Sequence, residues 1–239
     1  MDILPAQEFP EIIGRFSRKK LLLVLFAVIF LLTGIFVVAP FIAEPTSPLK
    51  EIFITNITDG QATITWSTDK PTKGTVKVQN VIYKDDGDKN KKSQGFYATH
   101  LVTVGALRPA VSYNYEVYQG WRKVYEGTFT TAIILNSINN PNPVYGKVVD
   151  AANRPQVGVI VYLTAINQNE KSALYSTLTN NEGRWQIDLA NFRTRDLKAP
   201  FSLTAETVQE AVVQTGSRGK FKAATDMDND QPWPDIIVN

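Results

Sequence analysis

Residues 52–66 read IFITNITDGQATITW, and they indicate how this part of the chain folds. Apolar residues alternate with threonine from Ile52 to Thr58 and again from Ala62 to Trp66, a period of two that is typical of β-strands. Asp59 and Gly60 stand between the two runs, where this dipeptide is a strong hairpin signal. The stretch therefore predicts two paired strands.

The same pattern continues on the C-terminal side of this predicted hairpin. Further strands are predicted from Thr75 to Tyr83, from Tyr97 to Val104, from Ser112 to Tyr118 and from Val124 to Thr131. Turn residues separate these runs, and no amphipathic helical pattern interrupts them. This half of the sequence therefore predicts an antiparallel β-sandwich.

Four segments of this half have a familiar order, namely ITNITDGQATITWST, HLVTVGALRP, SYNYEVY and GTFTTA. Over about 48–132 this order resembles a fibronectin type III domain, in particular the variant at the N-terminus of purple acid phosphatases. In that resemblance Trp66 is the core tryptophan of the second strand, and Leu107, Pro109 and Tyr113 form the turn into the sixth. The resemblance implies a tyrosine-corner hydrogen bond from Tyr113.

The second half has a different succession of glycines and β-branched residues. It contains G-x-V-x-D from Gly146, P-x-x-G-x-x-V-x-L from Pro155 and T-x-x-x-x-x-G-x-W from Thr177. This order, over about 143–239, is similar to the carboxypeptidase regulatory-like, or transthyretin-like, β-sandwich. Gly146 and Gly158 are expected to allow close backbone approach.

Later parts of this half are harder to place. Residues 181–183 read as a hairpin turn before an alternating strand, and strands are expected at 201–208, 220–225 and 235–238. The resemblance fades after about Leu197. The segment TVQEAVVQTGSRGKF is either an atypical insertion or a long hairpin, so the structure of 205–222 is open.

The N-terminal part of the chain predicts a membrane anchor. Leu21 to Ala43 is uncharged and apolar, and as a helix it would reach about 34 Å, enough to span a bilayer with some tilt. Arg15, Arg18, Lys19 and Lys20 precede it, so the positive-inside rule places residues 1–20 in the cytoplasm. The rival interpretation is a cleaved signal peptide, but the apolar run is longer than such a peptide requires.

Together these patterns predict an all-β chain, with two tandem antiparallel β-sandwiches after a single N-terminal transmembrane α-helix. Two stretches rich in proline are expected to act as extended spacers, one after the anchor and one between the sandwiches. The predicted parts are a cytoplasmic tail 1–20, a transmembrane helix 21–43, a linker 44–48, a fibronectin type III-like sandwich 49–132, a linker 133–143 and a carboxypeptidase regulatory-like sandwich 144–239.

Composition argues against most kinds of chemistry. The chain has one histidine and no cysteine, so it offers neither disulfides nor thiol chemistry, and a serine triad would have to use His100. That residue lies in a predicted strand in register with Val102 and Val104, which favours a packed core histidine. The net charge of +2 gives no field for nucleic acid. We therefore predict a protein that is not an enzyme and has no required cofactor.

Two groups of carboxylates are candidates for a functional site. Asp226, Asp228 and Asp230 alternate as in oxygen-rich Ca²⁺ loops, but Gln231 stands where an EF-hand needs glycine. They are weak calcium candidates against a solvated acidic turn. The mixed-charge stretch from Lys84 to Lys92 is expected to be a solvated hairpin tip.

Aromatic residues are the remaining candidate for a site. Tyr118, Trp121 and Tyr125 surround the predicted hairpin between the last two strands of the first sandwich, where a flat face could stack on sugars or another protein. The alternative is that alternate members of the group fill the core.

These observations predict a single-pass cell-surface protein, N-terminus cytoplasmic and sandwiches extracytoplasmic, that serves as a noncatalytic binding, adhesion or structural module. Its expected partners are envelope polysaccharides or other surface proteins. The alternative is an accessory subunit that presents a separate envelope enzyme or a secretion or surface assembly at the membrane.

Overall fold

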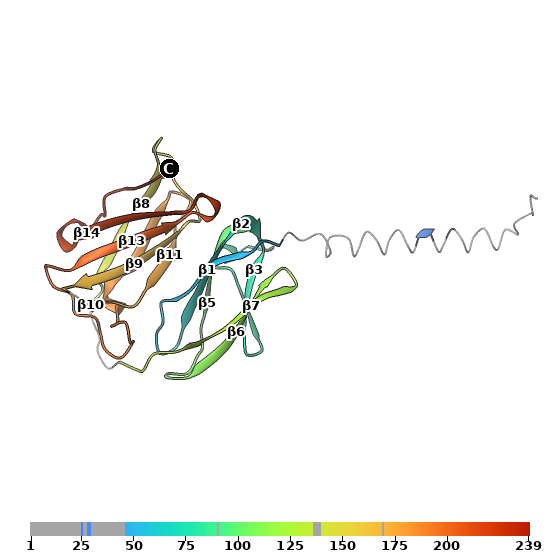
Figure 1. Cartoon of the computed structure of the whole chain (residues 1–239), viewed down its shortest axis with the longest axis horizontal. Coiled ribbons are helices and arrows are strands. Elements are labelled where there is room, and N and C mark those ends of the chain that lie inside the picture. The colour runs from blue at the N-terminus through green and yellow to red at the C-terminus, as the bar shows by residue number, and fades with distance from the viewer. Residues whose placement is uncertain (1–24, 26–27, 30–45, 90, 136–139, 169) are drawn as a thin grey trace, which may run out of the picture. The chain divides into compact units, whose positions relative to one another are not determined.

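The computed structural model describes residues 46–89, 91–135, 140–168 and 170–239, together with Leu25, Val28 and Ile29. The chain divides into two units, residues 1–44 and residues 45–239 (Figure 1). Within the described part of the chain, no helix is both long enough and apolar enough to cross a membrane. The predicted helix at 21–43 falls almost wholly outside the described residues.

The first sandwich places three strands against four, in the orders β1-β2-β5 and β4-β3-β6-β7. This order of strands, with the hairpin β1–β2 and the Greek-key crossings between sheets, is fibronectin type III-like, as the sequence predicts. The strands are β1 (Leu49–Thr55), β2 (Ala62–Thr72), β3 (Gly74–Val78), β4 (Val81–Lys84), β5 (Tyr97–Val104), β6 (Ser112–Gln119) and β7 (Arg122–Thr130).

The core of this sandwich confirms the residues on which the resemblance rests. Trp66 is fully buried among Ile64, Val102 and Val117. The hydroxyl of Tyr113 accepts a hydrogen bond of 2.8 Å from the backbone N–H of Arg108, which is the expected corner bond. Burial along β3 and β6 follows the alternation seen in the sequence.

The second sandwich is built from two further sheets, ordered β10-β9-β13-β14 and β12-β8-β15, with β11 also paired to β9. Glycine at position 146 is required here, because a Cβ atom would lie 2.8 Å from the Cβ of Trp233. The strands are β8 (Pro143–Asp150), β9 (Ile160–Asn167), β10 (Glu170–Lys171), β11 (Tyr175–Leu178), β12 (Arg184–Asp188), β13 (Val208–Gln214), β14 (Lys220–Asp226) and β15 (Ile236–Val238).

Several predicted strands are wrong in detail. The run from Thr75 to Tyr83 is not one strand, because the chain turns at Gln79, whose φ is +54°, and returns as β4. Residues 181–183 do not close a hairpin, since β11 and β12 belong to different sheets. The expected strand at 201–208 is absent from the described structure there, whereas 208–226 forms the long hairpin β13–β14.

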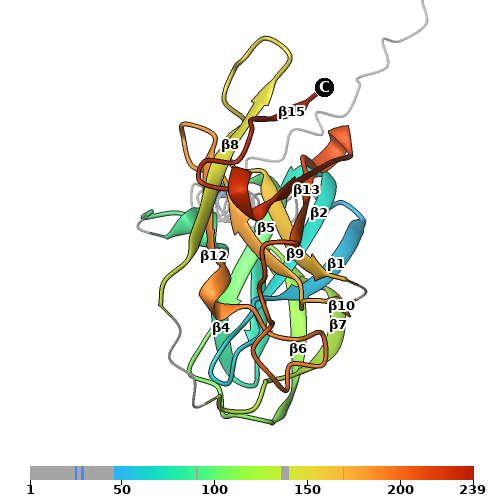
Figure 2. The same ribbon diagram turned by 90° about the vertical axis from the view of Figure 1, so that its left-hand side faces the viewer.

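The sandwiches are also not purely antiparallel. β15 runs parallel to β8, with Ile236 opposite Val148 and Val238 opposite Asp150 (Figure 2). The last strand comes from a distant part of the chain, so nothing in a local turn constrains its direction. A parallel pair of this length is consistent with the all-β class but not with a strictly antiparallel fold.

Strand β2 is buried on both of its faces. Ala62, Ile64 and Trp66 face the core of the first sandwich, while Thr63 and Thr65 face the second sandwich and are equally inaccessible. A central strand of a two-sheet sandwich normally leaves its outer face to solvent. Here the sheet of the second sandwich that contains β9 and β13 covers that outer face.

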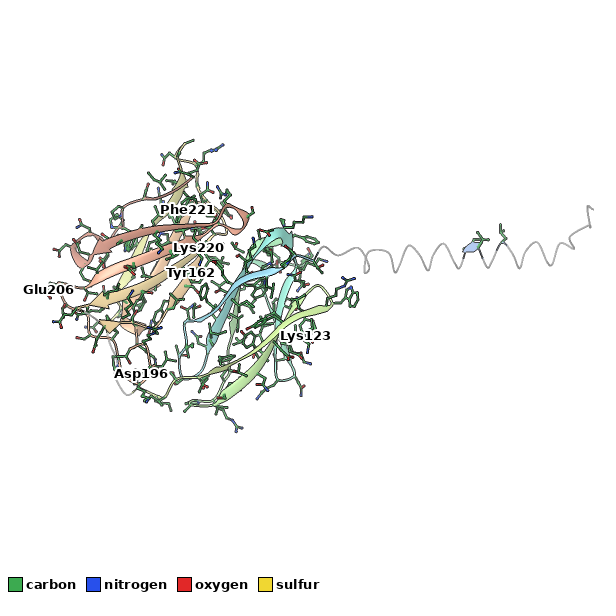
Figure 3. All side chains as sticks on the ribbon, in the orientation of Figure 1. Lys123, Tyr162, Asp196, Glu206, Lys220 and Phe221 are labelled. Atoms are coloured by element: carbon green, nitrogen blue, oxygen red, sulfur yellow. The ribbon has the colours of Figure 1, made fainter. Side chains whose placement is uncertain are left out.

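A separate apolar cluster holds the two sandwiches together. Leu101 from β5 packs with Ile160 and Tyr162 from β9, and the rings of Phe53 and Tyr162 meet edge to face at 5.3 Å. The hydroxyl of Tyr162 donates to Thr65 at 2.9 Å, and Lys220 pairs with Glu51 at 2.7 Å (Figure 3). Residues 45–239 therefore form one compact unit.

Asn56 closes the open edge of β11. Its backbone N–H donates to the carbonyl of Leu174 at 3.1 Å, and its side-chain amide both accepts from the N–H and donates to the carbonyl of Ser176, each at 2.9 Å. Asn56 has a φ of +49°, a conformation that asparagine tolerates better than most residues. An unpaired strand edge of one sandwich is thus capped by a single residue of the other.

Replacing this residue tests how much the cap contributes. Asn56→Ala should lower the free energy of unfolding of residues 45–239 by about 1–3 kcal/mol, because the N–H and C=O of Ser176 lose their partners. The control is Asn56→Gly, which keeps the backbone conformation without strain and loses only the side-chain bonds. Urea unfolding measures both; an Asn56→Gly variant as stable as the parent would contradict the role of the cap.

Candidate binding surface

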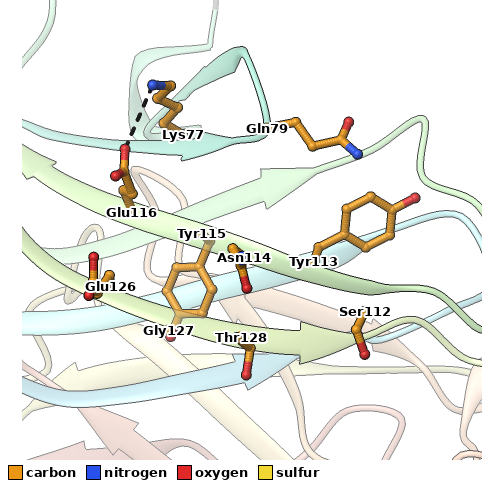
Figure 4. A pocket seen from close by; sticks show the side chains of 10 residues that line it. All are labelled: Lys77, Gln79, Ser112, Tyr113, Asn114, Tyr115, Glu116, Glu126, Gly127 and Thr128. Atoms are coloured by element: carbon orange, nitrogen blue, oxygen red, sulfur yellow. Dashed lines mark ion pairs between the residues drawn. The ribbon is translucent and has the colours of Figure 1, made fainter.

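The four-stranded sheet of the first sandwich carries a shallow groove on β3, β6 and β7 (Figure 4). The outward-facing residues of these strands line the groove with polar and charged groups, and the buried rings of Tyr113 and Tyr115 also border it. The lining residues are Lys77, Gln79, Ser112, Tyr113, Asn114, Tyr115, Glu116, Glu126, Gly127 and Thr128. Such a surface offers hydrogen-bond donors and acceptors at fixed spacing.

Glu116 is the electrostatic centre of the groove. Its carboxylate accepts a hydrogen bond from the hydroxyl of Tyr118 at 2.8 Å and lies 3.2 Å from the ammonium of Lys123 and 3.8 Å from that of Lys77. The Tyr118 hydroxyl, followed by Lys123, holds the pKa of Glu116 below its usual range. Glu116 therefore stays an anionic acceptor in mildly acidic solution.

Removing the Tyr118 hydroxyl tests its part in lowering the pKa of Glu116. Tyr118→Phe should raise the pKa of Glu116 back toward its usual value, as measured by NMR titration of the side-chain carboxyl. Because the folded pKa is lowered, this carboxylate contributes stability above its usual pKa and loses it as the pH falls through the folded pKa. Lys123→Met is the comparison variant and should also raise the pKa, because it removes a hydrogen bond and a nearby positive charge. An unchanged pKa of Glu116 in Tyr118→Phe would contradict the role of the hydroxyl.

The three predicted aromatic residues do not form one face. Tyr118 points outward to Glu116, whereas Tyr125 lies opposite Val117 on the inner side of the sheet, 6.0 Å from the ring of Tyr115. Trp121 lies in the turn between β6 and β7, 53% exposed, with the guanidinium of Arg122 5.0 Å from its ring centre. A flat aromatic platform is therefore not available, although Trp121 and Tyr125 are both exposed.

The three aspartates that the sequence suggests as calcium ligands have different hydrogen-bond partners. A carboxylate oxygen of Asp226 accepts from the N–H of Asp228 and from the side chain of Asn229, which caps the short 3-10 helix Met227–Asn229. Asp230 is buried and receives a hydrogen bond from Gln209. Nowhere in the described residues do three histidine, cysteine, aspartate or glutamate side chains gather as metal ligands.

His100 is buried in the first sandwich, as predicted. Its ring stacks on Trp66 with centroids 4.6 Å apart, its Nε2 lies 3.0 Å from the hydroxyl of Thr72, and its Nδ1 lies 2.8 Å from a carboxylate oxygen of Asp85. A hydroxyl, an imidazole and a carboxylate in this order resemble a catalytic triad, but all three are inaccessible to solvent. These three side chains are therefore part of the interior of the first sandwich.

The loop from Lys84 to Lys92 is not the solvated hairpin tip that the sequence predicts. It crosses from β4 in one sheet to β5 in the other, and its short 3-10 helix (Asp86–Asp88) turns two carboxylates inward. Asp85 meets His100, and Asp88 accepts from the hydroxyl of Tyr97 at 2.7 Å. The prediction was wrong because it treated the charges as a group and missed the buried partners on β5.

The linker after the predicted anchor is also more ordered than a free spacer. Ser47 is buried, its N–H donates to the side-chain oxygen of Gln119 at 2.8 Å, and its carbonyl accepts from the same amide at 2.7 Å. The hydroxyl of Ser47 in turn accepts from the backbone of Asp69 and Lys70. No periodicity or motif marks this contact, which joins residues 72 positions apart.

Known proteins assign this chain neither a family nor a ligand. No family model matches the chain, and no curated protein matches it. Among solved structures, the chain is similar to the crystal structure of the FN1–FN3 domains of chicken CNTN1, with 13% identity over 76% of this chain and 67% of that chain and a TM-score of 0.27. So distant a likeness carries no information about ligands, and the fibronectin type III-like fold rests on strand order and core residues.

Proposed function

We propose that this chain is a noncatalytic binding and structural protein of the cell envelope, displayed by an N-terminal membrane anchor. The observation that best supports a structural module is the burial of both faces of β2, the central strand of the sheet β1-β2-β5. Two sandwiches joined in this way hold their outer surfaces at a fixed spacing. Residues 45–239 would then project a constant surface away from the membrane.

The anchor is the segment 21–43, with residues 1–20 in the cytoplasm and the sandwiches outside. Its support is the uncharged apolar run and the basic residues before it. We also propose the finer family assignments: the purple acid phosphatase variant for the first sandwich and a carboxypeptidase regulatory-like domain for the second. Both modules accompany enzymes as noncatalytic parts, which agrees with the inaccessibility of His100.

An envelope polysaccharide is the ligand that the polar groove favours. Glu116, Asn114 and Thr128 offer acceptors and donors on one sheet face, which is the kind of surface that hydroxyl groups of sugars match. Lys77 and Lys123 neutralise the nearby carboxylates, so a neutral or weakly charged polymer fits better than a highly charged one.

Protease treatment of intact cells that express the full chain tests the display. We expect the protease to release fragments from beyond Ala43. An N-terminal fragment, sized by mass spectrometry, should stay in the membrane. A mature protein that begins near Pro40 or Glu44 and appears in the medium would contradict the anchor and indicate a secreted protein.

A second candidate is an accessory subunit that presents a separate enzyme or assembly. The observation in its favour is strand β4, which ends its sheet and exposes Val81 and Ile82, the latter by 66%. An apolar edge strand can pair with a strand of another protein. Ile82→Lys should abolish co-purification of such a partner from detergent-solubilised membranes. Retention of that partner by the variant would exclude this edge as its docking site.

A further inference from the structure

One end of the first sandwich carries exposed aromatic rings beside cationic side chains. Trp121 is exposed at the turn β6–β7, and Phe96, before β5, is 49% exposed. The ammonium of Lys73 lies 5.1 Å from the ring centre of Phe96, and Arg122 lies over Trp121. Exposed large rings next to lysine or arginine are typical of surfaces that meet the membrane–water interface.

These groups form one end of the first sandwich because backbone contacts tie their loops together. The N–H of Gly120, beside Trp121, donates to the carbonyl of Lys73 at 3.2 Å, which joins the turn β6–β7 to the turn β2–β3. Ser47 is bonded to Gln119 on one side and to the backbone of Lys70 on the other. We call this end, made of Lys70, Lys73, Phe96, Trp121 and Arg122, the basic aromatic end.

The position of Ser47 in the sequence fixes where this end must be if Ala43 ends a membrane-spanning segment. The chain from Ala43 to Ser47 can reach at most about 14 Å when fully extended. The headgroup region adds roughly 5–8 Å on each side of the hydrocarbon core. A residue bonded to Ser47, such as Gln119, is thus held within a short distance of the lipid headgroups.

We propose that the basic aromatic end rests on the lipid headgroups and orients the two sandwiches on the membrane. Trp121 and Phe96 enter the interface, and Arg122, Lys73 and Lys70 face the lipid phosphates, for which a guanidinium is well suited. The inference rests on the proposed anchor, because only the anchor brings Ser47 to the membrane. It adds a second, noncovalent contact that a simple tether lacks.

The tryptophans of the chain make this contact measurable. Of the four, Trp66, Trp185 and Trp233 are buried, so quenching by lipid-borne groups reports mainly on Trp121. The full-length protein is reconstituted into liposomes of phosphatidylcholine and phosphatidylglycerol that carry a nitroxide either near the headgroup or deep in the acyl chain. We expect stronger quenching by the shallow nitroxide, and loss of that difference in Trp121→Phe.

Charge is tested with a matched pair of variants. The double variant Lys70→Glu, Arg122→Glu should reduce the shallow quenching, whereas Lys147→Glu, Lys222→Glu, two exposed charge reversals on β8 and β14, should leave it unchanged. Flotation and alkaline extraction of the same liposomes report on the anchor separately. Equal quenching in Trp121→Phe and the parent, with the chain resistant to alkali, overturns the headgroup contact alone. A chain that alkali extracts overturns both the contact and the anchor.

Discussion

His100→Phe should lower the free energy of unfolding of residues 45–239 by about 3–5 kcal/mol. The carboxylate of Asp85 lies beneath the surface, and His100 is the side chain that faces it there, at 2.8 Å. Phenylalanine keeps the stacking on Trp66 but cannot pair with that carboxylate or with the hydroxyl of Thr72. The loss therefore measures the cost of leaving a buried acid without its partner. Urea unfolding at neutral pH gives the value.

Asp85→Asn is the control, because an amide can still accept from the N–H of Gly87 and bond to His100. Burial raises the pKa of Asp85 above its usual 3.8, and the hydrogen bond to His100 only partly opposes this. Since the folded pKa is raised, the contribution of Asp85 to stability is complete below about pH 3.8 and is lost as the pH rises through the folded pKa. Between about pH 3.8 and the folded pKa of Asp85, the free energy of unfolding of Asp85→Asn should therefore fall less than that of the parent. An equally large loss in Asp85→Asn and His100→Phe at neutral pH would contradict the role of the histidine.

Leu101→Asp should have the second large effect, because it places a charge in the apolar contact between the two sandwiches. Leu101 is buried against Ile160 and Tyr162, so a carboxylate at this position would be taken out of water among apolar side chains. We expect a loss of about 3 kcal/mol or more, and replacement of a single unfolding transition by two, since each sandwich keeps its own core. Calorimetry of residues 45–239 measures the transitions.

Val157→Asp is the matched control for this substitution. Val157 is 55% exposed, so the same change of side chain meets solvent there and should alter stability by no more than about 0.5 kcal/mol. A Leu101→Asp variant that unfolds in one transition at the stability of the parent would show that the sandwiches do not depend on this contact.

The sequence predicts the fold of the first sandwich well because its signals are local. Alternation marks β2, β5 and β6, the dipeptide Asp59-Gly60 marks the turn between β1 and β2, and Trp66 marks the core. The second sandwich is harder to predict from the sequence because strands that follow one another in the chain belong to different sheets. The turn at 181–183 has the residues of a hairpin, yet it carries the chain from one sheet to the other.

The contact between the sandwiches corresponds to an uncharged strand face, which the alternation of residues does not by itself identify. The outer face of β5 and of β2 from Thr63 to Ser67 carries threonines and no charged residue, whereas the solvent face of β6 carries Glu116. A sheet face that stays in water normally includes charged side chains, so an uncharged threonine face indicates a cover. Alternation alone could not reveal this, because threonine is equally suited to an exposed strand.

The candidate site was only partly predictable for a related reason. Aromatic residues around a hairpin can be found from sequence, but their sides of the sheet depend on register. Tyr125 lies opposite Val117, whose side chain is in the core, so Tyr125 is on the inner side of the sheet, whereas Tyr118 is on the outer side. The hydrogen bonds between Ser47 and Gln119 join distant segments through side-chain and backbone groups that any loop contains, so no sequence pattern predicts them.

The most direct test of the central claim, that the two sandwiches hold one another at a fixed spacing, uses the absence of cysteine from the chain. Thr128→Cys on the first sandwich and Glu182→Cys on the second, both at exposed positions, provide two unique sites for spin labels. Pulsed electron spin resonance of the labelled full chain should give a single narrow distance distribution, and Leu101→Asp should broaden it. A broad or double distribution in the parent would show that the sandwiches move independently and would contradict the claim.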